Sequence, residues 1–106
     1  MSDENQKNVW IVYNDTRKDY GAAEKYGKLR DIFSNILPRN YNGPKMIEHV
    51  RYTLRNYRAG DYILVVGDPV LVAMATAVAL EHDPVINYLR WDNFDFNYTP
   101  FSVDFD

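Results

Sequence analysis

The sequence predicts an α/β fold: a three-layer Rossmann-like domain with a mainly parallel sheet of about four strands and an antiparallel C-terminal edge hairpin. Residues Asp61 to Val66 include an apolar strand without alternation, which is typical of a strand covered on both faces. Gly67 then forms a turn, and residues 70–80 form a helix with almost no polar face. Strand and helix patterns alternate along the rest of the chain, and right-handed crossovers between them make the strands parallel.

The first strand is predicted over residues 9–13, which read Val-Trp-Ile-Val-Tyr and contain only β-branched and aromatic side chains. The turn-forming residues Asn14, Asp15 and Thr16 follow it. The polar residues 1–8 precede the strand, and we expect them to form a flexible N-terminal tail. The remaining residues 9–106 have a size typical of a single domain.

An amphipathic helix is predicted over residues 22–33, because apolar positions recur there at steps of three and four with charged side chains between them. These positions are Ala22, Tyr26, Leu29 and Phe33. Gly27 weakens a helix by about 1 kcal/mol relative to alanine. A glycine at this position therefore indicates a close packing contact.

A loop is predicted over residues 38–43, and a second helix begins at Pro44, because proline is favoured in the first helical turn. Residues 59–60 end this helix. Its apolar edge consists of Ile47, Val50, Leu54 and Tyr57. Its outer edge consists of Lys45, Glu48, Arg51, Arg55 and Arg58.

The second strand is predicted over residues 62–66. Asp68 and Pro69 then begin the third helix, because the carboxylate can accept a hydrogen bond from a free backbone N–H and proline fits the first helical position. Such a cap stabilises a helix by roughly 1 kcal/mol.

The last two strands are predicted over residues 85–91 and 94–105, with a turn at residues 92–93 between them. The apolar positions change phase at Pro100. Proline within a strand pattern predicts a bulge or an edge position, so this hairpin is expected at the edge of the sheet.

Composition limits the class of protein. The chain contains no cysteine, which excludes disulfides, thiolate nucleophiles and cysteine-ligated zinc. The longest apolar run, residues 70–80, is about half of the roughly 20 residues that a membrane span needs. The polar N-terminus is unlike a signal peptide. We therefore expect a soluble, cytoplasmic protein that is not secreted through a signal peptide and does not bind a membrane.

Charge is distributed unevenly, although the net charge of the chain is only −3. Residues 17–58 carry ten basic and four acidic side chains, whereas residues 59–106 carry one arginine and eight acidic side chains. Two interpretations fit this asymmetry. The charges form neighbouring solvated faces of one domain, or they reflect partner binding or self-pairing.

Polar residues that follow two predicted strands form a candidate ligand site, because ligands of parallel α/β sheets bind beyond the carboxyl ends of the strands. They are Asn14, Asp15, Thr16, Gly67 and Asp68. Two aspartates could hold Mg²⁺ for phosphoryl transfer, but the further acidic, lysine and hydroxyl residues of phosphotransfer domains are missing. Turn formation and helix capping explain the two aspartates without a ligand. A phosphate-containing small ligand or nucleotide is therefore an alternative hypothesis.

Other catalytic patterns are missing from the sequence. The glycines form neither Gly-x-Gly-x-x-Gly nor a phosphate-binding loop, and no serine lies in a nucleophile elbow. His49 and His82 lack the spacing of a zinc site. We therefore expect a protein without catalytic residues, and no cofactor or metal ion.

The basic edge of the second helix is a candidate nucleic-acid contact. Its cations are Lys45, Arg51, Arg55 and Arg58, and tyrosines lie nearby in the sequence. Cations mixed with stacking rings suit phosphates and single strands. The sequence pI of 5.3 and the lack of a groove-reading motif argue against this function. Weak binding to a phosphate backbone is the second alternative.

The third helix and the C-terminal strand are candidate protein interfaces. The helix is apolar all round, so either it is the central helix on its face of the sheet or it packs on another subunit. The aromatic strand either pairs with a partner or caps the core. The candidate interface residues are Val72, Ala75, Thr76, Ala79, Phe94, Phe96 and Tyr98.

Two stretches of the chain resemble small proteins encoded by tailed bacteriophages. The first contains Asn14-Asp15, Asp19-Tyr20, Ala23-Glu24-Lys25-Tyr26-Gly27 and Leu29. The second contains Asp61-Tyr62-Ile63-Leu64, Gly67 and an alanine-rich helix. The two stretches cover about half of the chain. The resemblance implies a phage origin and brings no activity or catalytic residue. The basic loop at residues 39–45 and the long aromatic C-terminal strand depart from that pattern.

These observations together predict a small non-enzymatic bacteriophage protein that acts by protein-protein binding. The expected partner is a second copy in a homo-oligomer or another protein. A phage origin places the action in the virion or against a host factor in the host cytoplasm.

Overall fold

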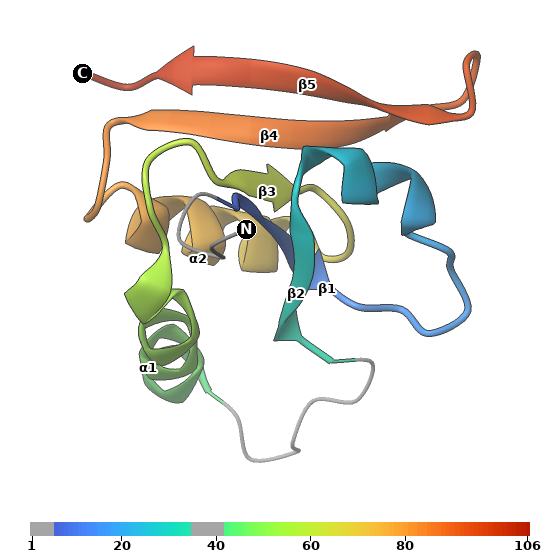
Figure 1. Cartoon of the computed structure of the whole chain (residues 1–106). Coiled ribbons are helices and arrows are strands. Elements are labelled where there is room, and N and C mark those ends of the chain that lie inside the picture. The colour runs from blue at the N-terminus through green and yellow to red at the C-terminus, as the bar shows by residue number, and fades with distance from the viewer. Residues whose placement is uncertain (1–5, 35–41) are drawn as a thin grey trace.

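The computed structural model describes residues 6–34 and 42–106 (Figure 1). Residues 1–5 of the predicted tail and residues 38–41 of the predicted loop lie outside the described residues. Along the chain the elements are β1 (Asn8–Tyr13), the 3-10 helix η2 (Gly21–Tyr26), β2 (Lys28–Phe33), α1 (Gly43–Thr53), the 3-10 helix η3 (Leu54–Asn56), β3 (Tyr62–Leu64), α2 (Pro69–Ala79), β4 (Val85–Asp92) and β5 (Asn97–Asp104).

The sheet has five strands in the order β2-β1-β3-β4-β5. β1 pairs in parallel with β2 and with β3, and β3 pairs in parallel with β4. β5 runs antiparallel to β4 at the edge. The predicted α/β class, the mainly parallel sheet and the antiparallel C-terminal hairpin are therefore confirmed. The predicted count of four strands is wrong, because part of a predicted helix forms β2.

The helix predicted over residues 22–33 is wrong. Its first half is the 3-10 helix η2, and its second half is the edge strand β2. Gly27 separates the two with a φ of 156°, and a Cβ atom there would collide with the backbone carbonyl of Lys7. This close approach lets the backbone N–H of Lys28 donate to the Lys7 carbonyl at 2.9 Å, next to the first residue pair of β2 and β1. Pairing with β1 satisfies the backbone groups that a helix would have satisfied.

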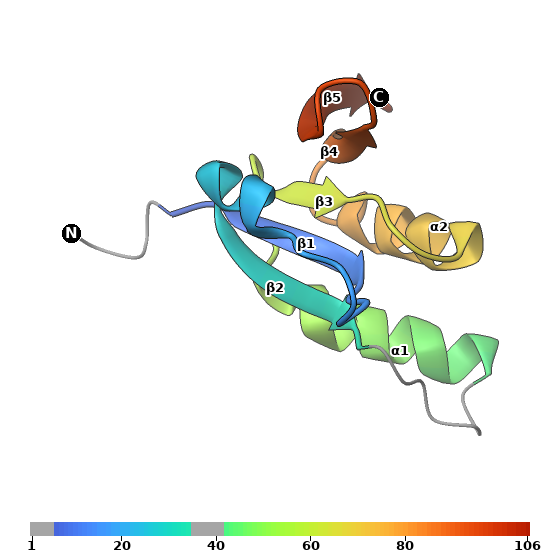
Figure 2. The same cartoon turned by 90° about the vertical axis from the view of Figure 1, so that its right-hand side faces the viewer.

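Helices α1 and α2 lie on one face of the sheet, and η2 lies on the other (Figure 2). The side chains of β1 alternate between the two cores. Trp10 and Val12 pack with α1 and α2, whereas Val9 and Ile11 pack with η2. The second covering layer is thus a six-residue 3-10 helix rather than an α-helix. The predicted three-layer Rossmann-like arrangement is not confirmed in that layer.

The starts of both α-helices match the prediction, with Pro44 and Pro69 in the first turn. The Asp68 carboxylate caps α2 by accepting a hydrogen bond from the backbone N–H of Val70 at 2.8 Å. α1 ends at Thr53, earlier than predicted, and the chain continues as η3. Among the described residues, no helix has both the length and the apolar character needed to cross a membrane.

The hairpin of β4 and β5 forms the edge of the sheet opposite β2. Pro100 lies in β5 and pairs with Leu89 of β4, which confirms the predicted edge position of the proline. Most side chains of β5 are exposed. This strand therefore contributes little to the core.

Candidate functional site

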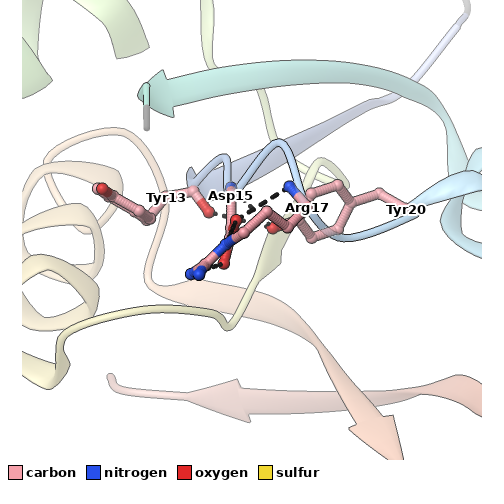
Figure 3. Close-up of polar contacts among 4 residues, drawn as sticks. All are labelled: Tyr13, Asp15, Arg17 and Tyr20. Atoms are coloured by element: carbon pink, nitrogen blue, oxygen red, sulfur yellow. Dashed lines mark hydrogen bonds and ion pairs between the residues drawn. The ribbon is translucent and has the colours of Figure 1, made fainter. Parts of the chain in front are cut away.

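A polar cluster lies at the carboxyl end of β1 (Figure 3). The Asp15 carboxylate accepts hydrogen bonds from the backbone N–H, Nε and Nη2 of Arg17, each at 3.0 Å. The Tyr20 hydroxyl accepts from the backbone N–H of Asp15 at 3.0 Å and donates to the Tyr13 carbonyl at 3.3 Å. Hydrogen bonds from Arg17 lower the pKa of Asp15 to about 2. The carboxylate is therefore already paired with a cation, and its contacts hold the loop after β1 in place.

The five residues of the predicted ligand site do not line one pocket. Asn14 donates from Nδ2 to Asp31 of β2 at 2.9 Å, and Thr16 is exposed in the loop. Gly67 and Asp68 instead line a pocket of about 590 Å³ between the starts of α1 and α2. Among the described residues, no group of three or more histidine, aspartate or glutamate side chains could hold a metal ion.

A second pocket, of about 540 Å³, lies where the chain leaves β1 and β3 for opposite faces of the sheet. This is the topological switch point at which open α/β sheets bind ligands. Its lining includes Lys18, Tyr20, Gly67, Trp91 and Tyr98. The rings of Trp91 and Tyr98 meet edge to face with centroids 5.1 Å apart. Burial raises the pKa of Tyr20 and of Tyr98, so both hydroxyls stay neutral at physiological pH.

The structure places two of the predicted interface residues of α2 in the core. Ala75 and Ala79 are fully buried in the core between the sheet and α1, so they cannot contact a second subunit. Val72 is partly buried against the same core. The Thr76 hydroxyl hydrogen bonds to the hydroxyl of Tyr88 at 2.8 Å. α1 and the sheet thus cover one side of α2, whereas its apolar residues Val70, Ala73 and Ala77 are exposed.

Three arginines line a groove of about 810 Å³ between β2 and the end of α1, which we call the basic groove. They are Arg30 of β2, Arg55 of η3 and Arg58. The Arg55 guanidinium lies 4.0 Å from the centre of the Tyr52 ring, and the ring itself is 66% exposed. Arg30 donates from Nε to Asn8 Oδ1 at 2.8 Å.

Two residues predicted for the same nucleic-acid contact do not line the basic groove. Arg51 forms an ion pair with Glu81 of the segment after α2, at 2.8 Å. Lys45 lies in the first turn of α1, at the opposite end of that helix. Of the four predicted cations, Arg55 and Arg58 therefore line the basic groove together.

A buried carboxylate organises one wall of the basic groove. Asp61 is fully buried and accepts hydrogen bonds from the backbone N–H of Asn8 at 3.0 Å and of Arg58 at 3.1 Å. It also accepts from Nε1 of Trp10 at 3.0 Å. A buried carboxylate requires such donors to replace water. Asp61 thus ties three lining residues of the groove together from inside the domain.

Exposed aromatic side chains gather on the hairpin of β4 and β5. We call this set the aromatic hairpin surface, and it consists of Phe94 and Phe96 in the turn, Trp91 on one face of the hairpin, and Phe101 and Phe105 on the other face. Phe94 is 95% exposed and Phe96 is 75% exposed, so the structure places these predicted interface residues in solvent. Tyr98, the third predicted aromatic, is buried.

A family model described as Phage Pam3 gp32-like protein matches residues 4–105. The chain belongs to this family. Its phage origin, predicted from the resemblance, is therefore confirmed. A search of curated proteins and a search of solved structures each found no match. The family description states no activity, so the function of this phage protein has to be argued from its surfaces.

The sequence alone does not reveal two residues that line these pockets from distant parts of the chain, Arg30 in the basic groove and Trp91 in the switch-point pocket. The sequence pattern predicts a helix at Arg30, and a helix there does not bring Arg30 to the groove that Arg55 also lines. Trp91 reaches the switch-point pocket from β4, far along the chain from Tyr20. Two features of the sequence could have indicated this arrangement. Gly27 marks the break before β2, and Asp61 directly precedes β3.

Proposed function

We propose that this phage protein acts by protein-protein binding through the aromatic hairpin surface, and that the partner is a second copy of the chain. The observation that carries the proposal is the exposure of Phe94 and Phe96 in the hairpin turn. Large exposed apolar side chains that lie near each other, as in this turn, are typical of interaction sites, and aromatic residues dominate the binding energy of protein interfaces. Its place of action would be the virion or the host cytoplasm.

The backbone of Phe96 supports the same proposal. Its φ is 50°, in the left-handed region that glycine and asparagine occupy most readily. Holding a bulky residue there costs of order 1 kcal/mol, and the exposed ring gains no core packing in return. A contact with a partner would offset this cost.

The outer edge of β5 favours contact through side chains over strand addition. Pro100 has no backbone N–H to donate to an added strand. The backbone N–H of Tyr98 donates to Asn97 Oδ1 at 2.9 Å, and its carbonyl accepts from the Tyr26 hydroxyl at 3.3 Å. An edge blunted in this way pairs poorly with another strand.

Sedimentation velocity over a range of protein concentrations tests the proposal. We expect the wild-type chain to associate as its concentration rises, and the double variant Phe94→Ser with Phe96→Ser to stay monomeric. Val70→Ser is the matched control, because Val70 is an exposed apolar residue outside the hairpin. A wild-type chain that stays monomeric at millimolar concentration would refute self-association.

A second candidate function is the binding of a small aromatic or phosphate-containing ligand at the switch-point pocket. Two features support it: the position of the pocket at the switch point and its lining by Lys18 and aromatic rings. Thermal shift with a panel of nucleotides, each with and without Mg²⁺, is the test. We expect a shift that is lost in Lys18→Glu and kept in Lys25→Glu, a change at an exposed residue outside the pocket. No shift with millimolar nucleotide would exclude this function for the compounds tested.

A further inference from the structure

We propose that the hairpin turn of one copy binds in the basic groove of a second copy, so that the chain assembles head to tail. The turn consists of residues 92–97, which read Asp-Asn-Phe-Asp-Phe-Asn. This inference rests on the proposed self-association and names the surface that receives the hairpin.

The basic groove has cationic groups without an anionic partner. Among the described residues, the ion pairs are those of Arg17 and Arg51, so the guanidinium groups of Arg30, Arg55 and Arg58 are not paired with carboxylates. Arg58 Nη2 donates to the carbonyl of Gln6, at 3.3 Å. One carboxylate, that of Asp31, also lines the groove and accepts from Asn14 Nδ2 at 2.9 Å. The arginines outnumber it, so the lining stays positively charged and favours an anionic occupant.

The lining of the groove also suits an aromatic side chain. Leu29, Trp10 and Tyr57 contribute apolar surface, and the exposed ring of Tyr52 lies beneath the Arg55 guanidinium. A phenylalanine ring entering the groove would pack on this apolar surface and interact with an arginine through its π face. The groove therefore combines cations with apolar lining.

The hairpin turn presents the complementary combination. Asp92 and Asp95 provide two carboxylates, neither of which forms an ion pair among the described residues. Asp92 Oδ1 accepts from the backbone N–H of Phe94 at 2.8 Å, a bond that shapes the turn and leaves the negative charge in place. Phe94 and Phe96 extend from the same turn. Acidic and aromatic groups on the turn thus match basic and apolar groups in the groove.

The positions of the two surfaces require a second copy. Figures 1 and 2 show α1 and the hairpin on opposite sides of the molecule, with the sheet between them. A turn on one side cannot reach the groove on the other side of the same chain. A contact between two different surfaces leaves one turn and one groove unused in every dimer, so association continues to a ring or an open filament.

Mixing two complementary variants tests this arrangement. The turn variant carries Phe94→Ser and Phe96→Ser and keeps its groove. The groove variant carries Arg55→Glu and Arg58→Glu and keeps its turn. Both arginine side chains are exposed, and Asp61 contacts only the backbone of Arg58, so both variants are expected to fold; circular dichroism checks this.

We expect each variant alone to associate at least about tenfold more weakly than the wild type in sedimentation velocity. An equimolar mixture should form a one-to-one heterodimer that does not grow further, because only one intact turn and one intact groove remain. Added NaCl should weaken the heterodimer, since charge contributes to the contact.

Three results would overturn the inference. If the groove variant associates like the wild type while the turn variant is monomeric, the hairpin binds elsewhere and only the proposed function stands. If the mixture forms no heterodimer although the wild type associates, the contact is not head to tail. If the wild type is monomeric and a single-stranded oligonucleotide binds it but not the groove variant, the groove is a nucleic-acid site and both proposals fail.

Discussion

The two edge strands of the sheet differ in what their side chains do. At the β2 edge, Ile32 and Phe33 are buried in the core. Gly27 at the start of the strand packs against the Lys7 carbonyl, and the buried Asp61 holds the neighbouring start of β1. At the β5 edge the large side chains are mostly exposed, and the phenylalanines of the turn, Phe94 and Phe96, are 95% and 75% exposed. The first edge is built into the domain, whereas the second presents apolar surface that the fold does not use.

This difference separates stability from binding. Residues at the β2 edge are expected to lower the free energy of unfolding when they are changed, because buried contacts and hydrogen bonds are lost. Substitutions at the tip of the β5 hairpin are expected to leave the free energy of unfolding unchanged or to raise it. The presence of a residue that lowers the free energy of unfolding or adds nothing to it is better explained by a contact with a binding partner.

The largest effect is expected at Asp61. Asp61→Ala should lower the free energy of unfolding by about 3 kcal/mol or more, because several buried donors lose their acceptor. Urea denaturation measures the loss. Asp95→Ala, an exposed acid in the hairpin turn, is the matched control and should change the value by less than about 0.5 kcal/mol. Equal effects of the two substitutions would refute the distinction between the edges.

Gly27→Ala is expected to have the second largest effect, about 2 kcal/mol of destabilisation. The new Cβ would collide with the Lys7 carbonyl at the point where β2 begins. Gly43→Ala is the control, because no atom lies within 4 Å of the Cβ position at Gly43. Chemical denaturation of both variants should show a loss for the first and no loss for the second. A stable Gly27→Ala variant would mean that the close approach is not required.

Phe96→Gly should raise the free energy of unfolding by about 0.5–1 kcal/mol, because glycine adopts the left-handed backbone without strain. The same substitution should reduce self-association in sedimentation velocity. Phe94→Gly is the control for the loss of a ring, since Phe94 is not among the residues with a positive φ. A destabilised Phe96→Gly variant would show that the ring supports the fold, contrary to its exposure.

The smallest effect is expected from acidification, at the polar cluster at the carboxyl end of β1. The folded pKa of Asp15 is about 2, below its usual value of 3.8. The ionised carboxylate therefore adds stability that is complete well above pH 3.8 and is lost as the pH falls toward 2. The stability difference between the wild type and Asp15→Asn should shrink over this range in urea titrations. A difference that stays constant would contradict the role of the Arg17 contact.

Local patterns were sufficient for several features. The apolar strands of residues 9–13 and 62–66 lack alternation, and the structure covers both faces of β1. Pro44 and Pro69 mark helix starts because proline fits only the first turn, and Asp68 caps α2 as expected. These features depend on neighbours in the chain, so the sequence by itself determined them. Phe94 and Phe96 could also be named as interface candidates from the sequence.

Other features depended on contacts between distant residues. The helical spacing of Tyr26, Leu29 and Phe33 was real, but pairing of Lys28 with Lys7 and β1 decided that residues 28–33 form a strand. That strand brings Arg30 to the groove of Arg55. The same reason applies to α2: its sequence shows an apolar surface all round, and only the packing of α1 and the sheet decides that Ala75 is buried. The tertiary structure decides which strands pair and which side chains are buried, because these contacts are between residues that lie far apart in the sequence.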